Sequence, residues 1–220
     1  SLPNRSLLSE RLSRAIVRAR REHGHVAVLF IDLDRFKDIN DSLGHATGDR
    51  ILRAAAARVQ QTVGTQHTVA RLSGDEFTVV LEDINGMPDA EDVAQRIIHA
   101  FHAPLNFGER LELAVSPSIG ISLYPEHAQV PTELLKHADL ALYQSKDSGR
   151  NSLHFFNHNL KTQASFALQL EEELRLALLR VKIRKTVCSR ACGSSALTRL
   201  RKMSSQTLTS IGTRLSRPCF

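Results

Sequence analysis

Two pairs of acidic residues stand where the surrounding sequence predicts the ends of strands. Asp32 and Asp34 follow Val26–Ile31, an unbroken apolar run of β-type residues that predicts a strand buried on both faces. Asp75 and Glu76 lie between two shorter β-type runs, directly after a glycine, which predicts a hairpin with an acidic tip. If the two β elements are neighbours in one sheet, these carboxylates converge.

Converging carboxylates suit a divalent metal ion that acts on phosphates. Mg²⁺ prefers hard oxygen ligands and is usually held by one or two carboxylates together with substrate phosphates. Such a site supports a two-metal displacement at phosphorus. The spacing alone also fits an ordinary alternative, in which the acids are solvated strand ends and turn residues, and both interpretations stay open at this point.

The rest of the chain predicts the elements that would hold these acids. Apolar residues at helical spacing predict helices over Pro3–Glu22, Thr47–Val63, Pro88–His102, Thr132–Lys146 and Gln163–Arg180. β-type runs predict hairpin strands at Val69–Leu72 and Phe77–Leu81, a strand over Leu111–Leu123 interrupted near Pro117, and a last strand at Leu153–Phe156. Because a hairpin interrupts the alternation of strands and helices, we expect an α+β fold with a mainly antiparallel central sheet flanked by helices.

Charge is divided unevenly along the chain. The 220 residues carry a formal net charge of +6, but Val181–Phe220 holds nine Lys and Arg and no Asp or Glu. Residues 1–180 therefore carry the other 20 Lys and Arg against all 23 Asp and Glu. The basic character belongs to the C-terminal segment, so composition does not mark the globular part as a nucleic-acid-binding domain.

All three cysteines, Cys188, Cys192 and Cys219, lie in that basic segment. Nothing indicates a disulfide framework, and a reducing compartment fits. The sequence contains no signal peptide pattern and no apolar run of about 18 residues. We therefore expect a cytoplasmic location and no membrane segment, and because the chain begins at Ser1, this expectation concerns this piece alone.

Four motifs together resemble the GGDEF family of diguanylate cyclases. They are IDLDRFKDINDSLGHATGDRIL at 31–52, ARLSGDEFTVVL at 70–81, SIGIS at 118–122 and ADLALYQSKDSGRN at 138–151. The resemblance holds in order and spacing from SLPNR at the N-terminus to about Phe156. It implies a palm-like sheet, related to nucleotide cyclases, with the signature hairpin beside the first strand. It also implies a bacterial signal-transduction transferase that, as a homodimer, condenses two GTP into cyclic di-GMP.

The resemblance further implies a metal site and a catalytic pair. The ligands of Mg²⁺, or of Mn²⁺, would be the side chains of Asp32 and Asp75 with the backbone carbonyl of Leu33. Asp75 and Glu76 would be the catalytic acids of the signature, and Asp75 would also assist deprotonation of the attacking 3′-hydroxyl.

The substrate contacts that the resemblance implies fall into two groups. Asn40 and Asp49 match a guanine-reading pair, and a carboxylate can accept from guanine N1–H and the 2-amino group, so GTP is expected over ATP. Lys37, Lys146 and Arg150 match phosphate contacts, which would offset charge on the leaving pyrophosphate. Taken singly, Asn40 also fits a turn, Asp49 fits the first turn of a helix, and the three cations fit a solvated surface.

The signature itself departs from the family, because Ser73 stands where the family has its first glycine. Ser73 and Gly74 would line the substrate, and a serine adds a Cβ and a hydroxyl where the backbone would approach the α-phosphate. Two hypotheses follow: a working cyclase that tolerates the serine, and a catalytically degenerate domain that binds GTP and regulates a partner. Arg71 is expected to orient the hairpin or a phosphate, or to pack beside the acids.

The family's product-inhibition motif, RxxD, would fall at residues 64–67, where this chain reads GTQH. Gly64 and His67 replace the arginine and the aspartate, so the inhibitory cyclic di-GMP site is expected to be absent.

The expected domains are a cyclase domain over 1–158, a connector helix over 159–180 and a basic tail over 181–220. The connector resembles the one that leads to an EAL phosphodiesterase domain, and too few residues follow for such a domain. Tail composition suggests disorder or a shifted reading frame.

A third function class is contact of the tail's cations with nucleic acid or an anionic membrane. Amphipathic spacing and interleaved aromatic residues are lacking in the tail, and no nucleic acid is expected.

Overall fold

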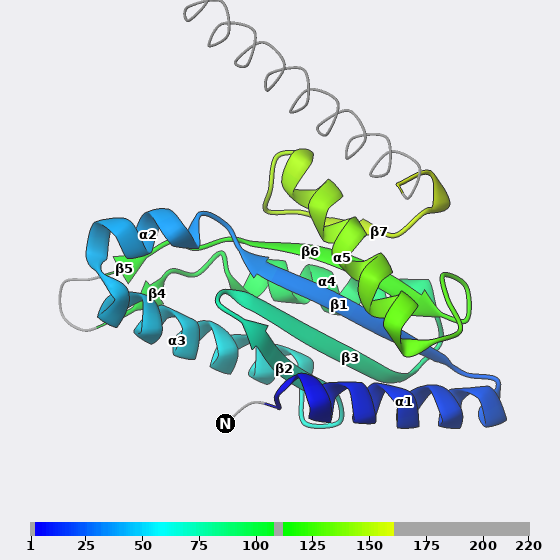
Figure 1. Cartoon of the computed structure of the whole chain (residues 1–220). Coiled ribbons are helices and arrows are strands. Elements are labelled where there is room, and N and C mark those ends of the chain that lie inside the picture. The colour runs from blue at the N-terminus through cyan, green and yellow to red at the C-terminus, as the bar shows by residue number, and fades with distance from the viewer. Residues whose placement is uncertain (1–2, 108–111, 161–220) are drawn as a thin grey trace, which may run out of the picture. The chain divides into compact units, whose positions relative to one another are not determined.

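A five-stranded sheet forms the centre of the computed structural model, which describes residues 3–107 and 112–160 (Figure 1). All of these residues belong to one compact unit, Ser1–Ala164. The sheet comprises β1 (His25–Leu33), β2 (Thr68–Ser73), β3 (Glu76–Ile84), β6 (Pro117–Tyr124) and β7 (Leu153–Phe155). The strand order is β2-β3-β1-β6-β7, and all neighbours are antiparallel except β6 and β7. The expected α+β class with a mainly antiparallel sheet is confirmed.

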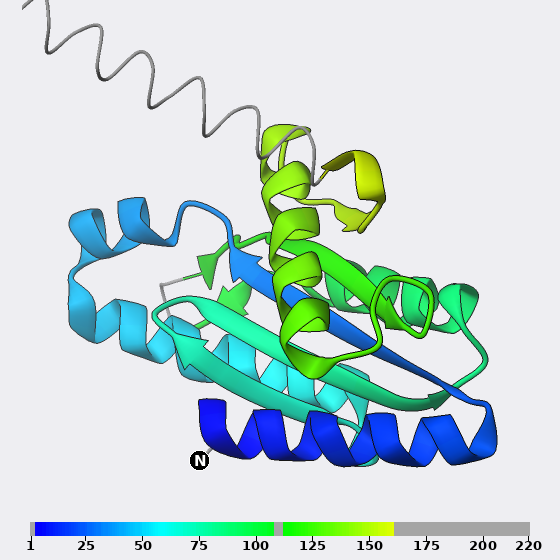
Figure 2. The same cartoon turned by 45° about the vertical axis from the view of Figure 1, so that its right-hand side comes forward.

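Five helices accompany the sheet in the described residues. They are α1 (Arg5–Glu22), α2 (Phe36–Leu43), α3 (His45–Val63), α4 (Met87–Ala100) and α5 (Pro131–Asp147). Helices α1 and α5 cover one face, and α3 and α4 cover the other (Figures 1 and 2). A separate two-stranded ladder joins β4 (Leu105–Asn106) to β5 (Glu112–Leu113). None of the described helices is both long enough and apolar enough to cross a membrane.

Strand β1 is buried on both faces, as its unbroken apolar run predicts. Leu29 and Ile31 point into the core shared with α3 and α4, whereas Val28 and Phe30 point into the core shared with α1 and α5. Since successive side chains of a strand alternate between faces, both faces of β1 require apolar residues. The acids that follow this run are therefore fixed in the middle of the sheet.

Gly120 lets helix α5 lie directly on strand β6. A Cβ added at Gly120 would stand 2.1 Å from the backbone nitrogen of Leu142 and 2.2 Å from the backbone oxygen of Ala138. These contacts are with helix backbone, which cannot turn aside as a side chain can. The glycine of the SIGIS motif thus sets the distance between α5 and the sheet.

The structure differs from the sequence-based elements at several points. Helix α2 was not predicted, and α3 begins at His45 rather than near Thr47, so Asp49 lies beyond the first helical turn that we expected for it. The predicted strand Leu111–Leu123, which we expected to be interrupted near Pro117, is two separate strands, β5 and β6, and the break falls at residues 114–116. The predicted helix Gln163–Arg180, the tail, and nearly all of the connector lie outside the described residues.

Candidate active site

The signature hairpin lies beside the first strand, which brings the two acidic pairs together. Asp32 of β1 is paired in register with Glu76 of β3, and Asp75 occupies the turn between β2 and β3. Asp32 is only 7% exposed. Burial is the largest cause that raises the pKa of Asp32, and the charges of Asp75 and Asp34 add to it. The sheet thus holds several carboxylates close enough to affect one another.

Lys146 supplies the positive charge at this acidic cluster. Its Nζ lies 2.7 Å from Oδ2 of Asp32 and opposes the rise in the pKa of that carboxyl. Lys146 lies in the last turn of α5, one turn beyond the residues that rest on Gly120. The close approach of α5 to β6 is therefore what carries the lysine to the end of β1.

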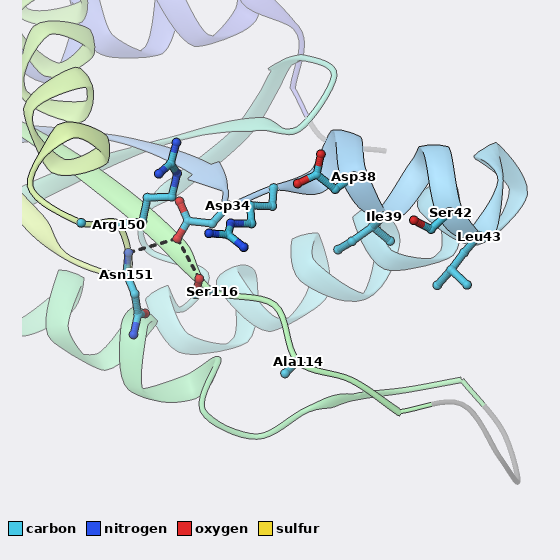
Figure 3. A pocket seen from close by; sticks show the side chains of 11 residues that line it. Asp34, Asp38, Ile39, Ser42, Leu43, Ala114, Ser116, Arg150 and Asn151 are labelled. Atoms are coloured by element: carbon cyan, nitrogen blue, oxygen red, sulfur yellow. Dashed lines mark hydrogen bonds between the residues drawn. The ribbon is translucent and has the colours of Figure 1, made fainter.

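Asp34 has a structural role that the sequence did not reveal. Its carboxylate accepts hydrogen bonds from the hydroxyls of Ser116 and Ser118, both at 2.7 Å, and from the backbone N–H of Asn151 at 3.0 Å. Figure 3 shows Asp34 between Ser116 and Asn151. Because these neutral donors already occupy both oxygens, Asp34 ties the end of β1 to the start of β6 and to the loop after α5.

The departure at Ser73 is accommodated in the turn. Ser73 does not adopt a positive φ, whereas Gly74 does, at 44°. The Ser73 hydroxyl donates to Oε2 of Glu76 at 2.7 Å, and Arg71 Nε donates to the carbonyl oxygen of Gly74 at 2.8 Å. Arg71 therefore orients the hairpin, and the extra hydroxyl is directed at the neighbouring glutamate.

Asn40 and Asp49 lie on the two helices that meet at Gly44. Asn40 belongs to α2, and its Oδ1 is buried with no hydrogen-bond partner in the described part of the chain. The Asn40 amide rests against Gly48 of α3, where an added Cβ would stand 1.8 Å from Oδ1. Asp49 is the next residue of α3 and is exposed. The helix corner thus brings an unpaired amide oxygen and an exposed carboxylate into neighbouring turns.

Two cavities adjoin these elements. One of about 670 Å³ lies beside α2 and the loop after α5, and Arg150, Asp34 and Ser116 help to line it (Figure 3). Another of about 720 Å³ lies between α3 and the signature hairpin, and its lining includes Arg71 and Ser73. Of the predicted substrate residues, Arg150 lines the first cavity, and Arg71, Ser73 and Gly74 line the second.

The remaining predicted residues lie on α2, in the loop after α5 and at the end of β1. Lys37 is exposed in the first turn of α2, with no hydrogen bond or ion pair within the described residues. Arg150 is exposed in the loop after α5 with a φ of 67°. Leu33 is fully buried and is the last residue of β1. Lys37 and Arg150 are thus free to meet a phosphate, and neither makes direct contact with the acids.

Asp139 belongs to the cluster and was missed in the sequence. Asp139 is exposed, yet partial desolvation and the charge of Glu76 raise its pKa, and Lys146 opposes that rise. Asp139 precedes Lys146 by seven residues in α5, which is two helical turns, so both lie on one face. This spacing within the fourth motif is the signal that could have identified it.

The donors fit Mg²⁺ better than a metal held by protein alone. In the described ranges, no group of three or more His, Cys, Asp or Glu is placed to hold a metal ion. Mg²⁺ keeps waters and takes one or two carboxylates plus substrate phosphates, so two aspartates with a nucleotide suffice. Asp32 and Asp75 lie close enough for the charge of Asp75 to raise the pKa of Asp32, so they are the pair that such a site would use.

Comparisons with known proteins agree with this geometry. The family model for the diguanylate cyclase GGDEF domain matches residues 1–152. The chain is 44% identical over 179 residues to the bifunctional diguanylate cyclase/cyclic di-GMP phosphodiesterase MucR of Pseudomonas aeruginosa. The aligned residues cover 81% of this chain and 26% of MucR. It is 46% identical over 152 residues to the diguanylate cyclase TpbB of the same organism, and these residues cover 69% of this chain and 35% of TpbB. The chain thus spans about a quarter to a third of these relatives.

Solved structures give the same result. The GGDEF domain of TpbB superposes with a TM-score of 0.70 at 44% identity, covering 71% of this chain and 98% of that domain. The active GGEEF domain of a diguanylate cyclase from Vibrio cholerae superposes with a TM-score of 0.65 at 30% identity, covering 72% of this chain and 99% of that domain. With the matched family model, these likenesses establish that the chain belongs to the GGDEF domain family of diguanylate cyclases.

Proposed function

We propose that this domain is a diguanylate cyclase that condenses two GTP into cyclic di-GMP and two pyrophosphates. The observation that carries the proposal is the cluster at the end of β1. There, buried Asp32 is paired with Glu76 of the signature hairpin and lies 2.7 Å from Lys146. Carboxylates for a metal and a cation for phosphate in one place are what phosphoryl chemistry requires.

The acids would hold the metal and take the proton. Asp32, Asp75 and the backbone carbonyl of Leu33 would be the ligands, and bound Mg²⁺ would supply Lewis-acid stabilisation of the phosphate oxygens. Asp75 would accept the proton of the 3′-hydroxyl, as a general base within reach of the reacting group. Glu76, which accepts from Ser73, would stay beside them.

The cations would stabilise the leaving group. Lys146 would contact the phosphates from α5, Lys37 from the first turn of α2, and Arg150 from the loop after α5. The 3′-oxygen would bond to the α-phosphorus as the bond to pyrophosphate breaks, so negative charge moves onto the pyrophosphate beside these side chains. Ser73 and Gly74 would lie against the substrate at the turn.

The α2–α3 corner would select guanine. The Asp49 carboxylate would accept from N1–H and the 2-amino group, and Asn40 would add an amide contact. The unpaired Oδ1 of Asn40 supports a ligand here, because an unsatisfied buried acceptor costs about 1–3 kcal/mol. GTP is then preferred over ATP, which lacks those donors.

Turnover would need two domains, each holding one GTP, because each 3′-hydroxyl attacks the other nucleotide's α-phosphate. A homodimer is therefore part of the proposal. The cytoplasm, where GTP is available, is the location that goes with this activity.

The alternative is a degenerate domain that binds GTP and regulates a partner without forming product. Ser73 is the observation that favours it, since the family has glycine there. Against it, both signature acids are present, and the serine hydroxyl is engaged by Glu76 instead of being left free at the turn. We therefore favour a working cyclase.

Feedback inhibition through the 64–67 surface would be absent. Gly64 caps the C-terminal end of α3, and Nδ1 of His67 accepts the backbone N–H of Glu82 at 3.3 Å. Neither residue offers a guanidinium or a carboxylate to cyclic di-GMP. Added product at micromolar concentrations should leave the initial rate unchanged, and strong noncompetitive inhibition would contradict this.

The test is incubation of the purified protein with GTP and Mg²⁺, followed by chromatography for cyclic di-GMP and pyrophosphate. The proposal expects product from the wild type and none from Asp75→Ala. GTP binding without product in the wild type would favour the regulatory alternative, and failure to bind GTP would refute both.

A further inference from the structure

Two arginines on helix α3 tie it to the segment that follows α4. Arg50 donates from Nη2 to the carbonyl oxygen of Phe107 at 2.7 Å. Its guanidinium also lies 5.2 Å from the centroid of the Phe107 ring. A cation over an aromatic face and a charged hydrogen bond to a carbonyl act together here.

Arg58 repeats the arrangement further along the same helix. It donates to the carbonyl oxygens of Ala103 and Pro104, the latter at 3.2 Å, and lies 5.4 Å from the centroid of Phe101. The rise of 1.5 Å per residue puts Arg58 about 12 Å beyond Arg50 along the helix axis. The two arginines therefore make matched contacts at different distances from the α2–α3 corner.

The segment that they hold is anchored in the core. Phe101 is 4% exposed and Leu105 is 2% exposed, and both belong to the core cluster on the α3–α4 face. Residues 101–107 thus offer the arginines a fixed attachment point, and a helix tied to them is held against the domain.

In the described part of the chain, α2 contributes few buried side chains to the α2–α3 corner. Phe36 is the only residue of α2 that is fully buried. On α3, Ile51 and Leu52 pack inward, and Arg50 is the residue that lies between them and Asp49. The first turns of α3 are therefore held on the inside by apolar contacts and on the outside by Arg50.

We propose that Arg50 is a positioning residue that sets the orientation of Asp49, and with it the discrimination of the guanine base. This inference rests on the proposed function, since it assumes that Asp49 reads guanine. A guanidinium can stack on a ring and donate to a carbonyl at once, which a lysine ammonium cannot do in the same geometry. Arg58 has the same contacts but no neighbouring base-reading residue, so it serves as the matched control.

The experiment is a titration of wild type, Arg50→Ala and Arg58→Ala with GTP, inosine triphosphate and inorganic triphosphate, each followed by calorimetry. Inosine triphosphate keeps N1–H and lacks the 2-amino group, so the ratio of the two nucleotide affinities reports how well a carboxylate meets both donors. Arg50→Ala should weaken GTP binding about tenfold and bring the ratio close to one, because a misplaced acceptor forfeits its hydrogen bonds. Inorganic triphosphate should bind as before.

Arg58→Ala should lower the thermal midpoint and leave the ratio at its wild-type value. An unchanged ratio in Arg50→Ala, or an equal change in Arg58→Ala, would overturn the inference. If Arg50→Ala does not fold, Arg50→Lys makes the same comparison, since it keeps the charge and loses the planar fork. A wild type without preference for GTP over inosine triphosphate would overturn guanine reading and this inference together, whereas a preference that survives in Arg50→Ala overturns this inference alone.

Discussion

The change Gly48→Ala should separate nucleotide recognition from stability. The added Cβ would stand 1.8 Å from Oδ1 and 2.9 Å from Cγ of Asn40, and 3.1 Å from Cζ of Phe36. These contacts are too short to persist, so the Asn40 side chain must leave its place. Since that side chain is flexible and can turn away, the backbone of α3 need not move.

The effect on stability should be small because two contributions oppose each other. Alanine in place of glycine inside a helix stabilises by about 1 kcal/mol. A displaced side chain in an unfavourable rotamer costs about 0.5–1.5 kcal/mol. The free energy of unfolding, measured by urea denaturation, should therefore stay within about 1 kcal/mol of the wild type.

The effect on GTP binding should be large by comparison. Loss of the Asn40 hydrogen bond to guanine costs about 1 kcal/mol, which weakens GTP binding five- to tenfold, roughly, by calorimetry. Inorganic triphosphate, which has no base, should bind unchanged. Asn40→Ala should lose the same affinity, and the double variant should lose no more than either single one.

Two results would refute this reasoning. One is Gly48→Ala protein that binds GTP as the wild type does. The other is a double variant whose losses add, because additivity would mean that the two residues act independently.

Three further perturbations test other parts of the account. Gly120→Ala places a Cβ 2.1 Å from the backbone nitrogen of Leu142. Urea denaturation should therefore show that the free energy of unfolding falls by about 3 kcal/mol or more. An unchanged free energy of unfolding would contradict the packing of α5 on β6. Ser73→Gly removes the hydroxyl that donates to Glu76 and should change the dissociation constant of GTP less than about threefold, whereas a tenfold loss would make the hydroxyl a substrate contact. Burial lowers the pKa of His127 from its ordinary 6.5, so the unfolded chain takes up a proton first and stability should fall as the pH drops below about 6.5. Nδ1 of His127 also accepts the N–H of Leu123, and His127→Gln should flatten this dependence in denaturation curves at pH 7.5 and 5.5.

The central strand and the signature hairpin could be predicted because local sequence determines them. An unbroken apolar run such as Val26–Ile31 suits burial on both faces, and two β-type runs around Gly74 suit a hairpin. These two elements are neighbours in the sheet, which brings Asp32 opposite Glu76. The spacing of the acids in the sequence was compatible with this pairing but did not require it.

Helix α2 could not be predicted, because little in its own sequence stabilises it. The residue before it, Arg35, has a φ of 55° and makes no capping hydrogen bond through its side chain. Phe36 alone is buried, and Asn40 rests on Gly48 of the next helix. Contacts with α3 therefore hold α2 in place, and such contacts are not visible as periodicity.

The partners of the buried acids could not be predicted either. Lys146 meets Asp32 across 114 positions of sequence, and the contact depends on where Gly120 lets α5 lie. In the sequence, Asp34 and Asp32 were equivalent as acids after the same apolar run. In the structure, the hydroxyls of Ser116 and Ser118 donate hydrogen bonds to the carboxylate of Asp34. Only the pairing of β1 with β6 separates the two aspartates into different roles.

The most direct test of the account is the rate of cyclic di-GMP formation at increasing protein concentration, with saturating GTP and Mg²⁺. If each domain supplies one GTP and two domains meet, the rate per domain should rise with concentration and level off once the dimer is complete. Asp32→Asn should abolish product at every concentration. Wild-type protein that binds GTP, reaches the dimer and still forms no cyclic di-GMP would contradict the proposed cyclase.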